Sequence, residues 1–233
     1  MKRPILVNTS KNFRLMELAS LKDLSELNLA EPVIFKLSMD LVNIDDFQNY
    51  LSFLNLAKLD EIKNEREKIR FIKTRGLINM LFSLENSEAE PIWKLNEYGK
   101  PYINGWDKNF SISHSRDLSV VVLASDAIGI DIEDNSRDID LEKFKRTKFL
   151  NFDEGAYESK EEFLMRFTAL EAYLKYIGKG FHKDAGNISV RKVNDAIVID
   201  DGSLIKAEVI RDGGYTISIV MNKKAYLKGA NYG

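Results

Sequence analysis

Two acidic residues placed two positions apart are the first feature of this sequence that could support chemistry. Asp131 and Glu133 alternate with Ile130 and Ile132 in a stretch that is typical of a β-strand. Residues i and i+2 of a strand point to the same face, so we expect the two carboxylates to project together and the isoleucines to face a core. Adjacent carboxylates repel one another, and Mg²⁺, which prefers carboxylate oxygens, would relieve that repulsion. An edge strand with its acids in solvent is the alternative interpretation.

A further acid and a lysine, Glu171 and Lys175, lie four residues apart in a stretch that predicts a helix over residues 158–177, so they share one face of it. The apolar residues of this stretch step by four, three, four and three, which predicts a buried stripe. The stripe consists of Phe163, Phe167, Leu170, Leu174 and Ile177. Glu171 and Lys175 flank it, which places them at the edge of the core; a surface ion pair is the alternative. Gly178 is expected to end the helix as a left-handed C-cap.

His114 and Ser113 lie at the end of a predicted strand that covers residues 109–115. A histidine flanked by hydroxyl groups and backbone donors suits phosphate binding, although a structural role is the common one for a single histidine. No nucleophile elbow accompanies them, so the sequence does not indicate a hydrolase triad. Both residues are therefore candidates for anion binding.

Basic residues upstream supply further candidates. Lys100 follows Gly99 and precedes a proline, which predicts a turn that presents the lysine on a rigid loop. Arg66, Arg70 and Lys73 are spaced i, i+4 and i+7 in a predicted helix, so they lie on one side of it and could form a phosphate-binding surface. Acidic residues are interspersed among them, and a solvated helix face is the alternative interpretation.

Regular elements predicted from hydrophobic periodicity would hold these residues in place. The expected helices cover residues 56–84 with one bend, 140–150 and 158–177, and the expected strands cover 33–41, 109–115, 118–124, 129–134 and short segments within 187–221. The connections after residues 115 and 124 are short enough for hairpins, which predicts an antiparallel meander of three strands. Four leucines at helical spacing favour short helical pieces before residue 31: Leu15, Leu18, Leu21 and Leu24.

The composition excludes several classes of protein. The chain has 233 residues, a formal net charge of −2 and no cysteine. The lack of cysteine excludes disulfides, zinc–thiolate sites and thiol nucleophiles, and the net charge provides no global field for nucleic acid or an anionic membrane. No run of residues is long enough for a membrane span, and the N-terminus becomes polar too soon for a signal peptide, so we expect a cytoplasmic protein.

Three blocks of this sequence, in their order and spacing, resemble the Sfp-like 4′-phosphopantetheinyl transferases. The blocks are Tyr98-Gly99-Lys100-Pro101 with Phe110–Ser115, then Gly129–Glu133, then Phe167–Lys175 closed by Gly178-Lys179-Gly180. The resemblance implies an α+β, pseudo-dimeric fold in which two similar α/β halves meet at a cleft. We expect residues 1–108 to form the N-terminal half, with the phosphate-binding helix and the Gly-Lys-Pro turn, and residues 109–233 to form the C-terminal half, with the metal-binding strand and helix.

The reaction implied by the resemblance is the Mg²⁺-dependent transfer of 4′-phosphopantetheine from coenzyme A to a serine of an acyl or peptidyl carrier protein. Asp131, Glu133 and Glu171 would be the Mg²⁺ ligands. Lys175 would stabilise the departing group, and the proton of the acceptor serine would go to Glu171 or to a water bound to the metal. A monomer without nucleic-acid or membrane partners is expected.

The resemblance also implies a set of coenzyme-binding residues. Lys175 would contact the pyrophosphate, and Lys100 and His114 would contact the adenosine end and its 3′-phosphate. Ser113 would contribute to the same anion-binding cluster. Arg70 would be an upstream phosphate-binding arginine.

Two positions depart from the family pattern. Phe167 stands where the family usually has tryptophan, and Leu170 precedes Glu171 where the family usually has lysine. We predict that Leu170 is buried and that Lys179 is the nearest basic residue that could replace the lysine. The departure at Leu170 keeps a rival interpretation open, in which the protein holds coenzyme A without transferring its phosphopantetheine. A Mg²⁺-dependent phosphodiesterase that uses water as the acceptor is a second rival.

Overall fold

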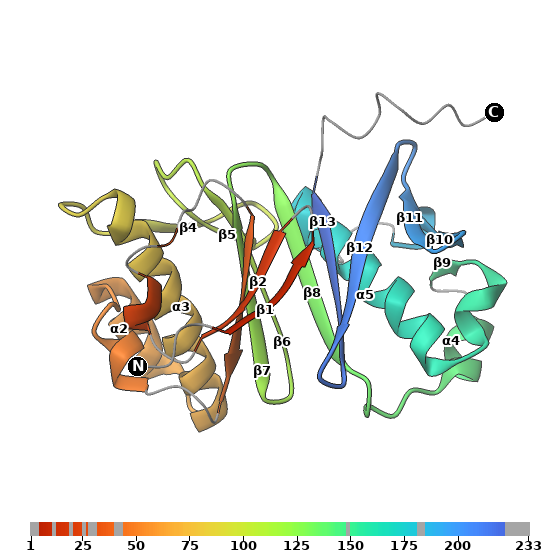
Figure 1. Cartoon of the computed structure of the whole chain (residues 1–233), viewed down its shortest axis with the longest axis horizontal. Helices are drawn as coiled ribbons and strands as arrows, with labels where there is room; N and C mark the ends of the chain where they lie inside the picture. The colour runs from red at the N-terminus through yellow and green to blue at the C-terminus, as the bar shows by residue number, and fades with distance from the viewer. Residues whose placement is uncertain are drawn as a thin grey trace.

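The structure is a computed structural model that describes residues 5–10, 13–18, 21–24, 27, 32–39, 44–147, 150–180 and 185–221. Two mixed sheets lie between helices, with α2 and α3 on the outer side of the first sheet and α5 on the outer side of the second (Figure 1). The α+β class is confirmed, while the likeness of the two halves stays a prediction. Among the described helices, none combines the length and the apolar character that a bilayer crossing requires.

The first sheet has the strand order β1-β2-β3-β7-β6. Its strands are β1 (Ile5–Ser10), β2 (Phe13–Glu17), β3 (Val33–Ser38), β6 (Asn109–Ser115) and β7 (Leu118–Ala124). Strands β6 and β7 form the antiparallel hairpin that the sequence predicts, and β7 pairs with β3 in the centre of the sheet. A separate two-stranded sheet, β4 (Trp93–Leu95) with β5 (Pro101–Ile103), flanks the Gly-Lys-Pro turn.

The second sheet has the strand order β8-β13-β12-β11-β10-β9. Its strands are β8 (Ile128–Asp134), β9 (Asn151–Phe152), β10 (Ser189–Val193), β11 (Ala196–Asp200), β12 (Leu204–Asp212) and β13 (Tyr215–Met221). The predicted short strands within 187–221 are thus present. Strand β8 lies at one edge of this sheet and pairs antiparallel with β13.

The side chains of Ser52, Asn64 and Ser159 cap the N-termini of three of the described α-helices. The α-helices are α1 (Ile44–Gln48), α2 (Phe53–Glu61), α3 (Glu65–Glu85), α4 (Leu141–Thr147) and α5 (Lys160–Ile177), and short 3₁₀ turns cover Leu21–Leu24, Glu154–Tyr157 and Ala185–Asn187. The predicted bend is the break between α2 and α3. It arises because the side chain of Asn64 accepts hydrogen bonds from two backbone amides and so starts a new helix.

Helix α5 carries the predicted buried stripe. Leu170 is fully buried, as predicted, and Phe163 and Leu174 are buried with it, while Phe167 and Ile177 are half-buried. Gly178 ends the helix in the left-handed region with φ 69°, which confirms the predicted C-cap.

Helix α5 packs on β8 at a very short distance because β8 contributes a glycine at the contact. A Cβ atom at Gly129 would overlap the carbonyl oxygen of Ala172 and the backbone nitrogen of Tyr176. Gly129 shares one strand face with Asp131 and Glu133, so the same close contact brings both acids next to α5.

Three clusters of apolar side chains form the core. One lies between the first sheet and α3, and another lies between the second sheet and α5. The third fills the space between the two sheets, and it includes Ile34 and Val120 from the first sheet and Ile130 and Ile132 from the second. The isoleucines of the acidic strand therefore face a core, as their alternation predicts.

The structure corrects three expectations about the chain's organisation. Strand β8 leaves the predicted meander and joins the second sheet, because its backbone pairs with β13 and not with β7. The change of sheet falls between Ala124 and Ile128, so residues 109–124, which were expected in the C-terminal half, belong to the first sheet. The expected helical pieces around Leu15 and Leu18 are wrong in part, since Leu15 lies in β2 and Leu18 directly follows it.

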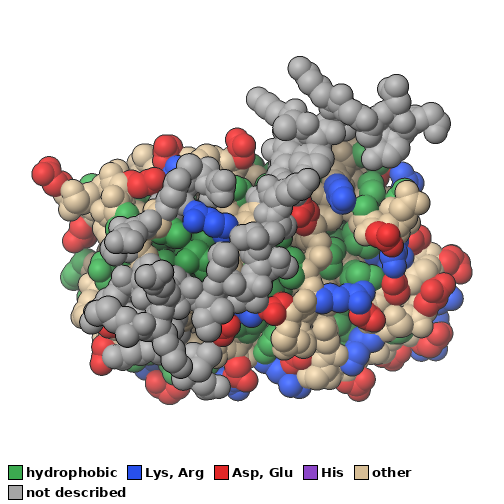
Figure 2. All heavy atoms as spheres, in the orientation of Figure 1, with side chains coloured by type: hydrophobic (Ala, Val, Ile, Leu, Met, Phe, Trp, Pro, Cys, Tyr) green, Lys and Arg blue, Asp and Glu red, His purple; other side chains and the backbone are tan. Residues whose placement is uncertain are grey.

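Charged side chains of both signs intermingle on the face of the molecule that Figure 2 shows. No large field of one sign covers the described residues of this face, which agrees with the net charge of −2. Local clusters of charge must therefore provide any electrostatic recognition.

Candidate active site

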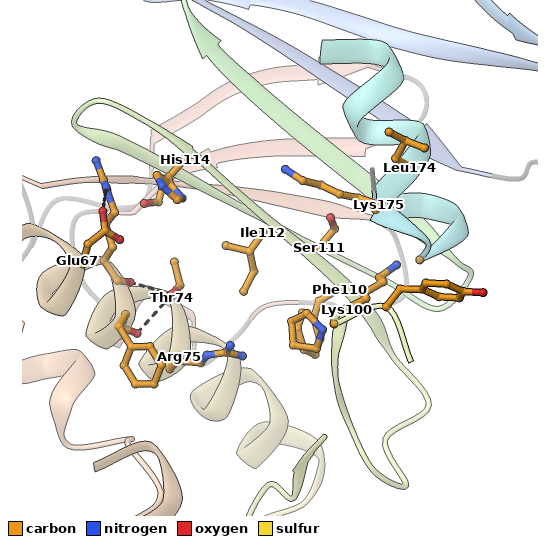
Figure 3. Close-up of a pocket in the computed structure, with 18 of the residues that line it drawn as sticks. Glu67, Thr74, Arg75, Lys100, Phe110, Ser111, Ile112, His114, Leu174 and Lys175 are labelled. Carbon is orange, nitrogen blue, oxygen red and sulfur yellow. Dashed lines mark hydrogen bonds and ion pairs between the residues drawn. The ribbon is translucent and has the colours of Figure 1, made fainter. Parts of the chain in front are cut away.

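A pocket of about 660 Å³ lies between α3, strand β6, the turn before β5 and the C-terminal end of α5 (Figure 3). Its volume is that of a site for a small molecule. The pocket is lined by Ile62, Glu67, Arg70, Phe71, Thr74, Arg75, Tyr98, Gly99, Lys100, Pro101, Phe110, Ser111, Ile112, His114, Ser119, Leu174, Lys175, Gly178 and Gly180. Five of these side chains are basic and one is acidic, so the pocket favours an anionic ligand.

Arg70 and His114 lie at one end of the pocket. Arg70 donates to the backbone carbonyl of Arg116 at 2.5 Å and forms an ion pair with Glu67, while its Nε is buried and has no hydrogen-bond partner. Burial lowers the pKa of His114, and the positive charge of Arg70 lowers it further. Arg70 supplies positive charge at this end of the pocket, and the imidazole of His114 can donate a hydrogen bond, so both side chains favour a bound anion.

Lys100 projects from the predicted turn, which the side chain of Asn96 stabilises. Asn96 Oδ1 accepts from the backbone nitrogens of Tyr98 and Lys100 at 3.0 and 2.8 Å, and Gly99 adopts a φ of 87°. The amide nitrogen of the same asparagine donates to the carbonyl of Gly178 at 2.8 Å, which ties the turn to the end of α5. Burial lowers the pKa of Lys100 to about 8.

Arg75 lines the pocket although the sequence did not single it out. Its guanidinium carbon lies 3.9 Å from the ring centroid of Trp93, a cation–π contact, and burial lowers its pKa to about 10. The stripe of pocket residues on α3 that includes Arg75 begins at Glu67 and continues at intervals of three and four residues, but the sequence alone does not tell which side of the helix faces the ligand.

The predicted phosphate-binding surface of Arg66, Arg70 and Lys73 does not form as one unit. Lys73 is buried and donates to the carbonyls of Ser38 and Met39 at 2.8 and 3.0 Å. Arg66 pairs with Asp117 on the turn between β6 and β7 and does not line the pocket. Only Arg70 of the three lines the pocket, because the packing of α3 on the sheet turns the other two away.

The acidic strand meets α5 beside the pocket. Asp131 is buried, and its Oδ1 accepts from Lys175 Nζ at 2.7 Å and from Ser113 Oγ at 2.7 Å. Its other oxygen, Oδ2, is buried without a hydrogen-bond partner among the described residues. Lys175 lines the pocket, so it joins the basic pocket to the carboxylate of Asp131.

Glu133 projects from the same face of β8 as Asp131, as predicted, but its carboxylate has other partners. Oε1 pairs with Arg137 at 2.6 Å and Oε2 accepts from Ser115 at 3.1 Å. Both oxygens of Glu133 are therefore occupied by donors from the protein.

Glu171 is half-buried on the face of α5 that meets β8. Its pKa is raised to about 7, chiefly because burial disfavours the charged form and further because the negative charge of Asp131 is near, although Lys175 acts in the opposite direction. A carboxyl group with a pKa near neutrality can accept or release a proton at physiological pH.

The donor set fits a hard divalent cation at Asp131 and Glu171. Asp131 Oδ2 is buried without a hydrogen-bond partner among the described residues, and the negative charge of Asp131 adds to burial in raising the pKa of Glu171, so a cation would relieve both. No group of three or more acidic, histidine or cysteine side chains in the part of the chain that the structure describes has the geometry of a metal site. Glu133, the third expected ligand, would first have to exchange its bond with Arg137 for the cation.

Two expected roles find little support in the positions of the side chains. Ser113 does not line the pocket, since its hydroxyl group faces Asp131, and Ser111 lines the pocket in its place. Lys179, considered as a replacement for the family lysine, is exposed and is not part of the lining. Lys175 and Arg137 are the cations that lower the pKa of Glu171, and the sequence analysis did not single out Arg137.

Comparisons with known proteins agree with the resemblance. Residues 127–220 match the model of the 4′-phosphopantetheinyl transferase superfamily. The chain is 32% identical over 112 residues to the 4′-phosphopantetheinyl transferase gsp of Aneurinibacillus migulanus, a match that covers 46% of this chain and 47% of that protein. It is 28% identical over 167 residues to the 4′-phosphopantetheinyl transferase Sfp of Bacillus subtilis (strain 168), which covers 66% of this chain and 73% of that protein.

Proposed function

We propose that this protein, an Sfp-like member of the 4′-phosphopantetheinyl transferase superfamily, transfers the 4′-phosphopantetheine of coenzyme A to a serine hydroxyl of an acyl or peptidyl carrier protein. The observation that carries the proposal is the junction at Lys175, which lines the basic pocket and bonds the buried carboxylate of Asp131. Lys175 would thus lie between the cations that bind the phosphates and the carboxylate that binds the divalent cation.

The charges of the pocket suit coenzyme A as the ligand. The molecule carries a pyrophosphate and a 3′-phosphate, and Arg70, His114, Lys100 and Lys175 line the pocket from end to end. Charge-assisted hydrogen bonds from such groups to phosphate are about twice as strong as neutral ones. Arg70 and His114 would bind the 3′-phosphate, and Lys175, beside the acids, would bind the pyrophosphate.

The reaction requires positioning and charge stabilisation more than covalent help from the protein. The serine oxygen forms a bond to the phosphorus that bears the pantetheine, and the bond from that phosphorus to the bridging oxygen breaks, which releases adenosine 3′,5′-bisphosphate. Lys175 would stabilise the negative charge of the leaving group. Glu171, which lies near Asp131 and Lys175, would take the serine proton.

Asp131 and Glu171 would hold Mg²⁺, with Glu133 as a third ligand once it is released from Arg137. The bound ion would supply positive charge beside the pyrophosphate. Lys175 already lies on Asp131 and would remain as the bridge between the carboxylates and the phosphates.

The decisive experiment incubates the protein with coenzyme A and Mg²⁺ in the presence and absence of an apo carrier protein and follows both by mass spectrometry. Addition of phosphopantetheine to the carrier serine is the expected result, and a carrier whose serine is replaced by alanine is the control. Hydrolysis of coenzyme A without a carrier would instead indicate a phosphodiesterase. Binding without any turnover would indicate a coenzyme A-binding module and would overturn the proposal.

A further inference from the structure

The two sheets meet at the edge strands β6 and β8, which lie side by side (Figure 1). Among the described residues no backbone pairing joins these two strands, since β6 pairs with β7 and β8 pairs with β13. Edge strands leave backbone amides and carbonyls without partners unless other groups satisfy them. The groups that satisfy them here are side-chain hydroxyls.

Three alternate serines of β6 form this junction, which we name the serine seam: Ser111, Ser113 and Ser115. Ser111 Oγ accepts from the backbone nitrogen of Ile130 at 3.2 Å. Ser115 Oγ accepts from the backbone nitrogen of Asp134 at 3.0 Å. The seam therefore replaces a backbone ladder with hydroxyl groups in a fixed register.

Two of the three serines also bond the acids of β8. Ser113 Oγ donates to Asp131 Oδ1 at 2.7 Å, and Ser115 Oγ donates to Glu133 Oε2 at 3.1 Å. Both pairs span 18 residues, so each serine faces one acid in the same register. An ionised carboxylate accepts and cannot donate, so the hydroxyl proton must point at the acid in both pairs.

The bond from Ser113 decides which oxygen of Asp131 remains available. Oδ1 receives both Ser113 and Lys175, while Oδ2 is left without a partner. Ser113 and Asp131 are 6% and 5% exposed, so water does not compete for this bond. Without the serine, the carboxylate could turn and present either oxygen to Lys175.

We propose that Ser113 and Ser115 are positioning residues that orient the carboxylates of Asp131 and Glu133 for a divalent cation, so that the first half of the fold aligns the ligands supplied by the second. The inference rests on the proposed function in so far as the cation is concerned. Groups that bond metal ligands commonly contribute about 10–100-fold to metal affinity or activity. Neither serine needs to touch the coenzyme for this role.

The test measures Mn²⁺ binding by electron paramagnetic resonance in the full chain and in the variants Ser113→Ala, Ser115→Ala and Ser111→Ala. We expect the first two to bind Mn²⁺ about 10-fold more weakly. Ser111→Ala is the matched control, because Ser111 lies on the same strand and, among the described residues, accepts from a backbone nitrogen and bonds no acid of β8. Its Mn²⁺ affinity should not change, and Ser115→Thr, which keeps a hydroxyl, should restore the parent's affinity.

Thermal melting of the same variants separates positioning from stability. If all three alanine variants lose similar stability and none loses Mn²⁺ affinity, the seam is merely structural and the inference is wrong.

Crystal structures of Ser113→Ala and of the parent supply a readout without metal. We expect the Asp131 side chain to rotate and its contact with Lys175 to change in the variant; an unmoved carboxylate would overturn the inference. Failure of the proposed function would give a different pattern. The parent protein itself would then bind no Mn²⁺, while the Asp131 side chain would still rotate in Ser113→Ala.

Discussion

Helices α3 and α5 both cover the outer face of a sheet and both line the same pocket, yet only α5 also carries an acid beside it. Helix α3 contributes Arg70 and Arg75 to the pocket lining. Arg70 forms an ion pair with Glu67, and Arg75 lies over the ring of Trp93. Helix α5 contributes Glu171 beside Asp131, with Lys175 between the acids and the pocket. The first helix therefore supplies positive charge to a ligand, and the second balances charge within the protein.

This difference separates affinity from chemistry. Interactions made equally in the bound substrate and in the transition state lower KM without raising kcat, whereas interactions made only in the transition state raise kcat. In the proposed function, Arg70 and His114 would contact the end of the ligand that does not react, so they would belong to the first kind. Asp131, Glu171 and Lys175 would surround the reacting position and would belong to the second.

The largest effect is expected for Asp131→Asn. The variant removes one negative charge from the cation site but keeps an oxygen that can accept from Ser113, so the fold should stay intact. Loss of such an electrostatic group should lower kcat by about 10²-fold or more, while the Kd of coenzyme A changes by less than about 3-fold. Rates of carrier modification and calorimetric titration with coenzyme A measure the two quantities. If the variant kept the parent's kcat, the acids of β8 and α5 would have no role in the reaction, and the prediction would be wrong.

The next effect concerns the opposite end of the pocket. Dephospho-coenzyme A should bind more weakly than coenzyme A by about 1.5–3 kcal/mol, the size of a hydrogen bond to a charged group. His114→Ala should reduce that difference, because its imidazole lies beside Arg70 where the 3′-phosphate is expected. Competition binding with both ligands provides the measurement, and kcat at saturation should change little. Undiminished discrimination by the variant would assign the 3′-phosphate to another residue.

A third prediction tests the buried side of α5. Leu170 is fully buried in the apolar cluster between α5 and the second sheet. The variant Leu170→Lys should therefore lose about 1.5–3 kcal/mol of hydrophobic stabilisation. For a chain of this size the melting temperature should fall by about 3–12 °C. Leu170→Met, which conserves volume, serves as the control. If Leu170→Lys were equally stable and markedly faster, Leu170 would mark a decayed catalytic position, and the coenzyme A-binding module would become the better interpretation.

The smallest predicted effect is the pH dependence contributed by Lys100. Its pKa of about 8 lies below the ordinary value of 10.5 because burial disfavours the charged form. The buried charge therefore lowers the stability of the ligand-free protein below pH 8, and this loss disappears as the pH rises from 8 toward 10.5. Coenzyme A favours the charged lysine, so its affinity should be full below pH 8 and about 3–10-fold weaker at pH 9. Lys100→Arg should keep its affinity at pH 9, since a guanidinium stays protonated. Parallel pH profiles for both proteins would refute the role of Lys100.

The parts of the fold that the sequence predicted are those that local periodicity determines. The stripe on α5, the cap at Gly178 and the shared face of Asp131 and Glu133 each follow from neighbours in the sequence. Strand β2 escaped prediction because Leu15 and Leu18 also fit a helical spacing, and its parallel pairing with β3 is not visible from composition. Strand β8 was assigned to the wrong neighbour because its true partner, β13, lies more than 80 residues later.

The candidate site shows the same division between local and distant information. The acids, Lys175 and Lys100 could be selected from residue type and spacing, and they lie beside or within one pocket. Periodicity could not decide which side of α3 faces the ligand, because the carbonyls that receive Lys73 belong to residues 34 and 35 positions earlier. Arg75 was missed for that reason.

The glycine at position 129 has a mechanical consequence. Helix α5 rests on the backbone of β8 there, without a side chain between them, so the two elements must move as one rigid body. The joint between the two halves combines the hydroxyl contacts of β6 and β8, which fix the register, with the apolar cluster between the sheets. One glycine therefore sets the separation between β8 and α5, which carry Asp131 and Lys175, while the serine seam sets the distance of both residues from Arg70 in the first half.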